Sequence, residues 1–540
     1  MRHGEVHAGE LIRSYSPLAR EQDGEGTRLE LKHRALIPSC FAMSPARKVH
    51  AACLAAILTM LLAAGCAVGP DFRKPPPPEV STYTAEPLAT TAAAANVTGG
   101  ASQRFNPDAD IPADWWTLFH SRPLNDLIEQ SLRKNPDLKA AQAALTAAWE
   151  DVLAQRGGYY PSLSASFSAS RQRQSGILAP ALSNNVLQYN LFTPEVAVSY
   201  VPDVFGLNRR TVESLQAQEQ AARFQMIATY TTLTSNVVVT AIQAGAIRSQ
   251  IDATRQVIDL NSRMLEILRY QLEKGYASGL DVAAQESQLA QAQALLPPLL
   301  KQSAQLRDAL AALTGVYPSQ APADDFELSS LKLPQDLPVS LPAALVEQRP
   351  DVLQAQANLH AASARVGVAI ANRLPNLMLT ANAGSTALAM NQLFTSGTGF
   401  WGLGASATAP LFEGGTLLHQ ERAAKADYLQ AAEQYRSTVL TACQNVADTL
   451  AALEQDAAAL EAAARAADAA KVTLDLAQRQ WQTGYAGYLA LLNAEQAYQQ
   501  ALSALVQAQA NRFADTAALF QALGGGWWHR PDLATDHHGH

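Results

Sequence analysis

Cysteine is scarce in this chain, and so are charged and aromatic side chains. Only 4 of the 540 residues are cysteine, 16% are charged and 7% are aromatic. So few cysteines in a chain of this length provide no disulfide framework. The net charge of −8 argues against the basic surface that nucleic-acid binding requires. Alanine and glutamine are abundant instead, which favours long helices with small packing residues.

Long apolar runs are also missing. The longest, 51–65 (AACLAAILTMLLAAG), is shorter than the roughly 18–20 residues that a membrane-spanning helix needs. Arg47 and Lys48 precede it and small residues close it, which is the order of a secretory signal; a buried core helix is the alternative. We therefore expect a signal peptide over 43–65, preceded by a non-native or disordered extension over 1–42.

One of the four cysteines follows directly on this run. Small residues before Cys66 (AAGC) resemble a bacterial lipobox, in which the cysteine is acylated and the chain is cut just before it. An ordinary small residue near a cleavage site is the alternative. Acyl chains contribute about 0.8 kcal/mol per buried CH₂ group, so an acylated terminus is a stable anchor. The resemblance, with Ala67 rather than Asp after the cysteine, implies the outer membrane and an acylated linker segment over 66–120.

The rest of the chain contains an internal repeat. The segment 129–163 is similar to 347–377, with a Pro-Asp pair near the start and a proline near the end of each at the same offset. Later, KGYASGLDV is similar to TGYAGYLAL. Two copies of one supersecondary unit explain these matches. We expect the first copy over 121–330, the second over 331–526 and a disordered tail over 527–540.

Each copy contains two stretches in which apolar and small polar residues alternate, as they do in a strand with two different faces. These stretches have about the length of tilted transmembrane strands; a soluble sandwich is the alternative. Four strands cannot close a barrel, because known barrels begin at about eight. If these strands span a membrane, several chains must therefore share one barrel. The four stretches are 161–170, 195–201, 376–384 and 400–410.

The other segments have helical periodicity. Residues 207–274 and 416–483 each contain no proline and could span about 100 Å as a helix. Four further segments are about half that length, so that one long helix could lie beside two short ones. Alanine at the packing positions and Gln, Ser and Asn elsewhere suit a coiled-coil tube in water, and a solid rod is the alternative. The shorter segments are 124–156, 280–314, 341–373 and 489–523.

Taken in order, these features resemble a known family. The lipobox cysteine, AVGPDFRKP, DWWTLFHSRPLNDLIEQSL and the two repeat copies are similar to outer-membrane efflux proteins of the TolC type, in the lipoprotein (NodT-like) branch. The resemblance implies an α+β membrane protein: a homotrimer that shares a twelve-stranded barrel and continues as a periplasmic helical tunnel. It also implies a passive channel for small molecules, joined by a periplasmic adaptor to an inner-membrane pump of the resistance-nodulation-division class.

Each copy contains one glycine-containing turn that joins a long helix to a short one. The resemblance implies that these two turns form a periplasmic tip that binds the adaptor. A carboxylate just past the first turn, Asp281, matches an acidic residue of the family; a ring of carboxylates would attract cations. The alternative is that Asp281 stabilises the first turn of its helix. The second copy departs from the family, with Ala490 and Asn493 in place of gate aspartates and Gln496 in place of an arginine. The candidate turn residues are Gly275, Tyr276, Ser278, Gly279, Gly484, Tyr485 and Gly487.

No arrangement of nucleophile, base and orienting acid emerges from the sequence, and no Cys/His set has metal spacing. We therefore expect neither an enzyme nor a cofactor. The competing interpretation is a lipid-anchored, non-conducting coiled-coil scaffold of the cell envelope. The four alternating stretches argue against it, because a rod has no use for paired amphipathic strands.

Overall fold

The computed structural model describes residues 67–86, 88–107, 109–173, 175, 187–321 and 326–534. They all belong to one unit, which begins at Ala64. The predicted extension over 1–42, the signal peptide, Cys66 and the last six residues lie outside the described residues.

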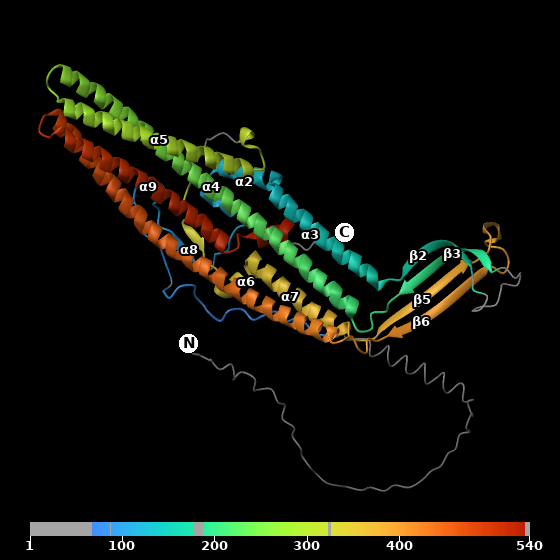
Figure 1. The fold of residues 1–540 in the computed structure, drawn as a ribbon. Helices are drawn as coiled ribbons and strands as arrows, with labels where there is room; N and C mark the ends of the chain where they lie inside the picture. Colours follow the sequence, from blue (N-terminus) through green and yellow to red (C-terminus); the bar gives the residue numbers. More distant parts are fainter. Residues whose placement is uncertain are drawn as a thin grey trace, which may run out of the picture. The chain divides into compact units, whose positions relative to one another are not determined.

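Two pairs of helices with matching lengths make up most of this unit (Figure 1). Helices α4 (Leu207–Glu273) and α8 (Thr416–Gln482) each have 67 residues, and α5 (Gly279–Leu313) and α9 (Tyr488–Ala522) each have 35. The predicted bounds agree with these to within a residue. Helix α4 packs against α5 and α9, and α8 packs against α9. Each long helix is about 100 Å long and leads from a strand to a turn.

The other two half-length segments are each divided in two, where the sequence analysis predicted one helix. The first becomes α2 (Arg122–Lys134) and α3 (Pro136–Arg156), and the second becomes α6 (Pro342–Gln348) and α7 (Pro350–Ala371). The reason is proline, which has no N–H to donate and is favoured at the first position of a helix. Proline does not end α5, which remains helical through Pro297 and Pro298.

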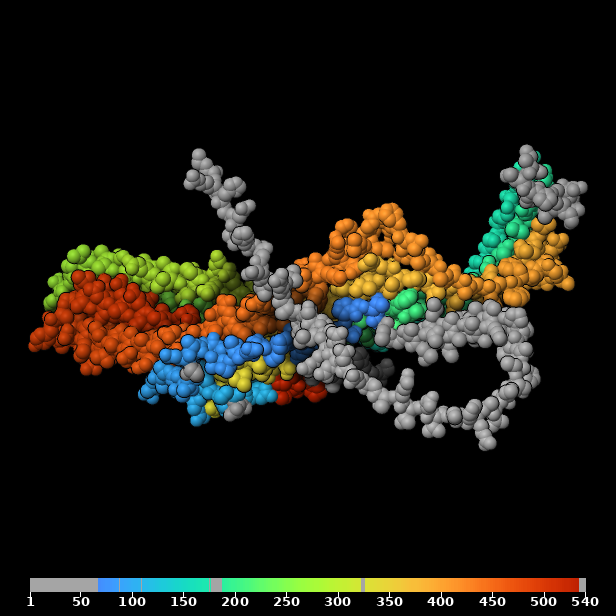
Figure 2. All heavy atoms as spheres, turned by 90° about the horizontal axis from the view of Figure 1, so that it is seen from below, coloured from blue at the N-terminus to red at the C-terminus, as the bar shows by residue number. Residues whose placement is uncertain are grey.

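Four strands form one antiparallel sheet at the end of the helices where α4 and α8 begin (Figures 1 and 2). The two strands of each copy pair with one another, and the two pairs are joined through β3 and β5. The order is β2-β3-β5-β6, so that β2 and β6 are edges and the described sheet is not closed. The strands are β2 (Ser162–Arg173), β3 (Gln188–Tyr200), β5 (Asn376–Ser385) and β6 (Gly399–Thr408).

The register of this sheet places the four apolar alternations on the same face. Ala165 lies opposite Val196, which lies opposite Ala383, which lies opposite Trp401. The other face carries small and polar residues, among them Asn382, whose amide donates to the Glu195 carboxylate at 2.8 Å. Among the described residues of a single chain, this apolar face is left open, and Trp401 and Leu403 are each 77% exposed.

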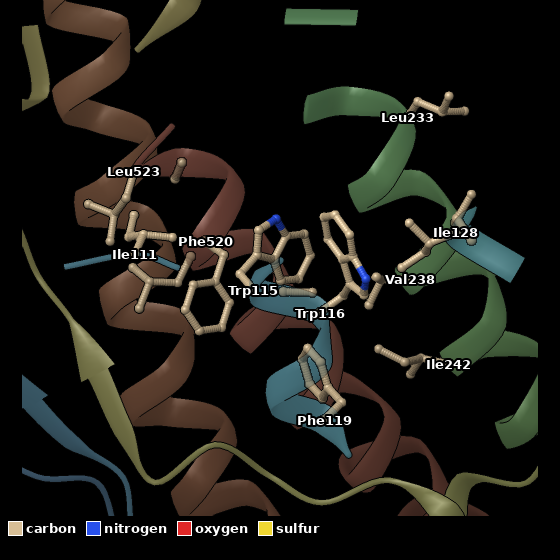
Figure 3. Packing of buried hydrophobic residues seen from close by; sticks show 14 of the residues in the cluster. Ile111, Trp115, Trp116, Phe119, Ile128, Leu233, Val238, Ile242, Phe520 and Leu523 are labelled. Carbon is tan, nitrogen blue, oxygen red and sulfur yellow. The ribbon is translucent and has the colours of Figure 1, made fainter. Parts of the chain in front are cut away.

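The hydrophobic core lies among the helices and includes a segment that precedes both repeat copies. Trp115, Trp116 and Phe119, in the short helix η1 (Trp115–Phe119), are all buried (Figure 3). The Trp115 ring stacks on Phe520 of α9, with 5.2 Å between the ring centroids. The last part of the linker expected over 66–120 is therefore packed into the core and contributes to the stability of the helices.

Two further pairings were not apparent in the sequence. Strand β1 (Arg104–Asn106) pairs in parallel with β4 (Asp336–Pro338). The two strands are more than 200 residues apart in the sequence. Near the carboxyl end, the indole of Trp527 is buried and donates to the Gln348 carbonyl oxygen at 2.7 Å. This packing differs from the disordered tail expected over 527–540. The remaining short elements are η2 (Gly157–Tyr159), η3 (Pro318–Gln320), η4 (Leu328–Ser330), η5 (Met390–Gln392), η6 (Trp527–His529) and α10 (Pro531–Ala534).

Candidate functional site at the helix tip

The two turns between the long and short helices have the same backbone geometry. Gly275 has φ +80° and Gly484 has φ +78°, a region that glycine enters without strain. The next residue in each turn, Tyr276 or Tyr485, donates its N–H to a carbonyl five residues earlier, at 2.8 and 2.9 Å. This is the Schellman pattern that ends helices. Both tyrosine side chains are more than 80% exposed.

The turns differ in how the following helix begins. Ser278 and Asp281 form a capping box at the start of α5, in which each side chain accepts the other's backbone N–H, at 3.2 and 3.0 Å. The Ser278 hydroxyl also donates to the Asp281 carboxylate at 2.7 Å. Gly487 occupies the equivalent position before α9 and provides no side-chain cap. Gly279 and Gly487 do not have the positive φ of Gly275 and Gly484.

Asp281 therefore has the local role that the sequence analysis left as an alternative, stabilising the first turn of α5. The capping box does not exclude a second role in the pore, because one carboxylate oxygen, Oδ2, accepts both of these hydrogen bonds. Of the two amide residues, Asn493 is exposed on α9, and Gln496 donates to Gln288 of α5 at 2.9 Å. The structure thus connects Gln496 across the two copies, from α9 to α5.

Sequence reasoning missed a buried carboxyl group beside these residues. Glu495 of α9 is 5% exposed, and its Oε2 atom has no hydrogen-bond partner in the described part of the chain. Burial raises the pKa of Glu495 to about 7. Burial also raises the pKa of Tyr488, the first residue of α9, and the carboxylates of Glu495 and Asp281 raise it further. In the sequence, the only indication of this burial was that Glu495 lies next to Ala494 on the apolar face of α9.

A second buried polar contact lies close by. The Gln285 amide of α5 donates to the Asn261 backbone and side-chain oxygens of α4, at 2.8 and 2.9 Å. Together with the contact between Gln496 and Gln288, it forms a polar connection from α4 through α5 to α9. Apolar side chains surround it, including Leu268, Val282 and Leu491. Such a connection favours one register of the helices over others, since a shifted register leaves buried amides without partners.

Searches for other kinds of site gave little. Within the described ranges, no group of three or more His, Cys, Asp or Glu side chains is placed to hold a metal ion. The same ranges contain no helix with both the length and the apolar character needed to cross a membrane. Cys443, half-buried in α8, has no disulfide partner in the described part of the chain.

Comparison with known proteins identifies the fold. A family model for outer membrane efflux proteins matches residues 127–316 and 341–525. The chain belongs to this family. As an outer membrane efflux protein, it is a transport protein of the outer membrane. It is similar to two proteins of Pseudomonas putida, the antibiotic efflux pump outer membrane protein ArpC and the toluene efflux pump outer membrane protein TtgC. Each is 28% identical over 485 residues, which is 89% of this chain and 97% of the relative.

Solved structures of outer-membrane channels share the architecture. The outer-membrane channel OprN superposes with a TM-score of 0.74 and 26% identity, covering 86% of this chain and all of that one. The outer membrane protein VceC of Vibrio cholerae superposes with a TM-score of 0.71 and 26% identity, covering 77% of this chain and all of that one. The efflux protein described here therefore has the fold of outer-membrane channels, as its resemblance to the TolC type predicted.

Proposed function

We propose that this protein is the outer-membrane channel of a tripartite efflux pump. Small toxic molecules, such as drugs or solvents, leave passively through its lumen. A periplasmic adaptor and an inner-membrane pump of the resistance-nodulation-division class deliver them and supply the energy. The names of the two relatives, which refer to antibiotics and toluene, support this class of cargo.

The observation that carries the proposal is the apolar face of the sheet. Leu403 and Trp401 point away from any partner in the described chain, and exposed large apolar groups of this kind need a covering. Membrane lipid is the covering that fits strands of 10 to 13 residues. In our proposal three chains assemble so that β6 of one chain pairs with β2 of the next. The result is a twelve-stranded barrel without edges.

The organisation of the chain is also part of this proposal. The two copies, 121–330 and 331–526, derive from one duplicated unit, which agrees with the equal lengths of α4 and α8 and of α5 and α9. The region 66–120 joins the copies to an acylated Cys66, so that the lipid and the barrel anchor the protein together.

At the other end, the two turns contact the adaptor. Tyr276 and Tyr485 support this role, since they are exposed aromatic residues on well-ordered turns, the kind of residue enriched in protein interfaces. In this proposal the constriction is lined by Asp281, Asn493 and Gln496, with one carboxylate from each chain of the trimer. Three like charges in a narrow pore attract cations and repel one another.

Single-channel recording in a planar bilayer tests the channel against the scaffold alternative. The mature, acylated protein should insert and give discrete conductance steps. If it inserts in verified amounts and gives no steps, and also none with the turns truncated, then the channel is refuted and the lipid-anchored scaffold becomes the better interpretation. Truncation of the turns is needed because a closed tip alone would also block the current.

The role of Asp281 in the constriction can be separated from its role in the cap. We expect Asp281→Asn to lower cation selectivity and to change the conductance, because it removes one charge per chain from the pore. Ser278→Ala is the matched control: it breaks the same capping box and keeps the carboxylate. Reversal potentials in a salt gradient provide the measurement. Equal effects of the two substitutions would mean that Asp281 acts only as a cap.

A further inference from the structure

A short segment at the start of the described chain lies against the beginning of α4. This segment, Ala67–Phe72, is called the amino-terminal strap below. The Val68 N–H donates to the Phe205 carbonyl at 3.1 Å, which places the strap just after the end of β3, at Tyr200. Figure 2 shows the first described residues, in blue, next to the start of α4, in green.

One arginine makes most of the contacts with the strap. Arg210, in the first turn of α4, donates from Nε to the Val68 carbonyl at 3.0 Å and from Nη2 to the Gly69 carbonyl at 3.3 Å. It also pairs with the Asp71 and Glu213 carboxylates, each at 2.7 Å. The arginine is 4% exposed. Its planar fork of donors can bind several oxygens at once, as a lysine cannot.

The position of this arginine is unfavourable for the helix itself. A cation in the first turn faces the positive end of the helix dipole, and burial adds a desolvation cost. The oxygens of the strap and Glu213 offset both effects. One of the two carboxylates and both backbone carbonyls come from the strap, so the arginine and the strap depend on one another.

Close backbone packing fixes the strap from its other side. Gly69 has φ +97°, and a Cβ atom added there would lie 2.4 Å from the Gly367 Cα atom of α7. Further along, the Phe72 ring stacks on His360, with 4.3 Å between the ring centroids, and His360 contacts Glu213 at 3.0 Å. The strap is thus held by backbone hydrogen bonds, an ion pair, a glycine contact and a ring stack.

We propose that Arg210 is a positioning residue for the lipid anchor. It fixes the strap to the junction of strand and helix, where the barrel meets the helical body. This rests on the proposed acylation of Cys66, whose Cα atom is about 3.8 Å from that of Ala67. The anchor then has almost no slack, and its acyl chains enter the leaflet directly beside the barrel. The lipid acts as a rigid attachment of the body to the membrane.

A distance measurement tests this proposal. In a Cys443→Ala background, spin labels at Val68→Cys and Thr211→Cys should give a narrow distance distribution in the purified, mature protein. Arg210→Met should broaden the distribution at least twofold, while the helical circular dichroism and the melting temperature of the body stay unchanged. Arg209→Gln is the matched control, since this neighbouring arginine pairs with Asp203 instead of with Asp71 of the strap.

A second variant acts from the side of the strap. Gly69→Ala should broaden the distribution to a similar extent with Arg210 in place, because the new methyl group collides with Gly367. If both variants keep a narrow distribution, or if Arg210→Met lowers the melting temperature and leaves the distribution narrow, the positioning role is refuted. Mass spectrometry of the same samples reports acylation of Cys66. A free Cys66 with a narrow distribution would refute the anchor and leave the strap contacts intact.

Discussion

Glu495 is a carboxyl group buried among apolar side chains near the tip, and its pKa is raised to about 7 by that burial. An unfolded glutamate has a pKa close to 4.5. Between these values the folded protein binds a proton that the unfolded chain releases, so this group makes the fold less stable as the pH rises from about 4.5 to 7. The cost at neutral pH and above is at most about 3 kcal/mol.

We therefore expect Glu495→Gln to stabilise the tip helices at pH 8 and to have little effect at pH 5. Hydrogen exchange of α9 amides at the two pH values measures this difference. Glu454→Gln, at an exposed position of α8, is the control and should have no effect at either pH. Equal stabilisation by Glu495→Gln at both pH values would mean that the effect comes from packing and not from ionisation.

At the scale of elements, the tip turns depend on two glycines in the left-handed conformation. Gly275→Ala and Gly484→Ala should each destabilise the turn by about 1 kcal/mol, because a Cβ atom is strained at positive φ. No neighbouring atom lies within 4 Å of the added methyl group at either position, so strain is the only cost. Gly279→Ala is the control. It lies within α5 at a position equally free of contacts, and it should be neutral or stabilising. Limited proteolysis at the turns would distinguish these outcomes.

The sequence predicted the long helices and the strands well, because their signals are local. Alternation identified β2 and β6, and helical periodicity bounded α4 and α8 to within a residue. What it missed depends on distant partners. The pairing of β1 with β4 and the joining of β3 to β5 both bring together residues far apart in the chain. The contacts between Arg210 and the amino-terminal strap could not be predicted either, since a lone arginine in a helix usually lies in solvent.

The candidate site was predicted to a similar extent. The turn residues could be located because Gly and aromatic residues recur in both copies. The alternative role of Asp281 followed from its place in the first turn of a helix, where negative charge is favoured. Glu495 could not be found in this way. Its burial arises from helices of both halves packing around it, and a glutamate on a helix is exposed in most proteins.

At the scale of the whole molecule, the proposed barrel places the apolar face of the sheet against lipid. We expect Leu403→Arg, in the middle of β6, to block membrane insertion. An arginine that faces the bilayer core raises the free energy of insertion by about 2–4 kcal/mol per chain. Ser406→Arg on the opposite face is the control, and it should insert and lower the conductance. Heat-modifiable migration and recovery in the outer-membrane fraction measure insertion. Normal insertion of the Leu403 variant would contradict the proposed orientation of the sheet.

The equal lengths of the paired helices restrict how this protein can change during evolution. In the proposed assembly both turns reach the same height and present a level surface to the adaptor. Each turn is the end of one 67-residue and one 35-residue helix. An insertion of seven residues moves a turn by about 10 Å, so it must occur in all four helices together. Single steps of this kind leave the tip uneven. The reach of the tunnel is therefore far harder to alter than its lining, and new cargo is accommodated by substitution within a fixed length.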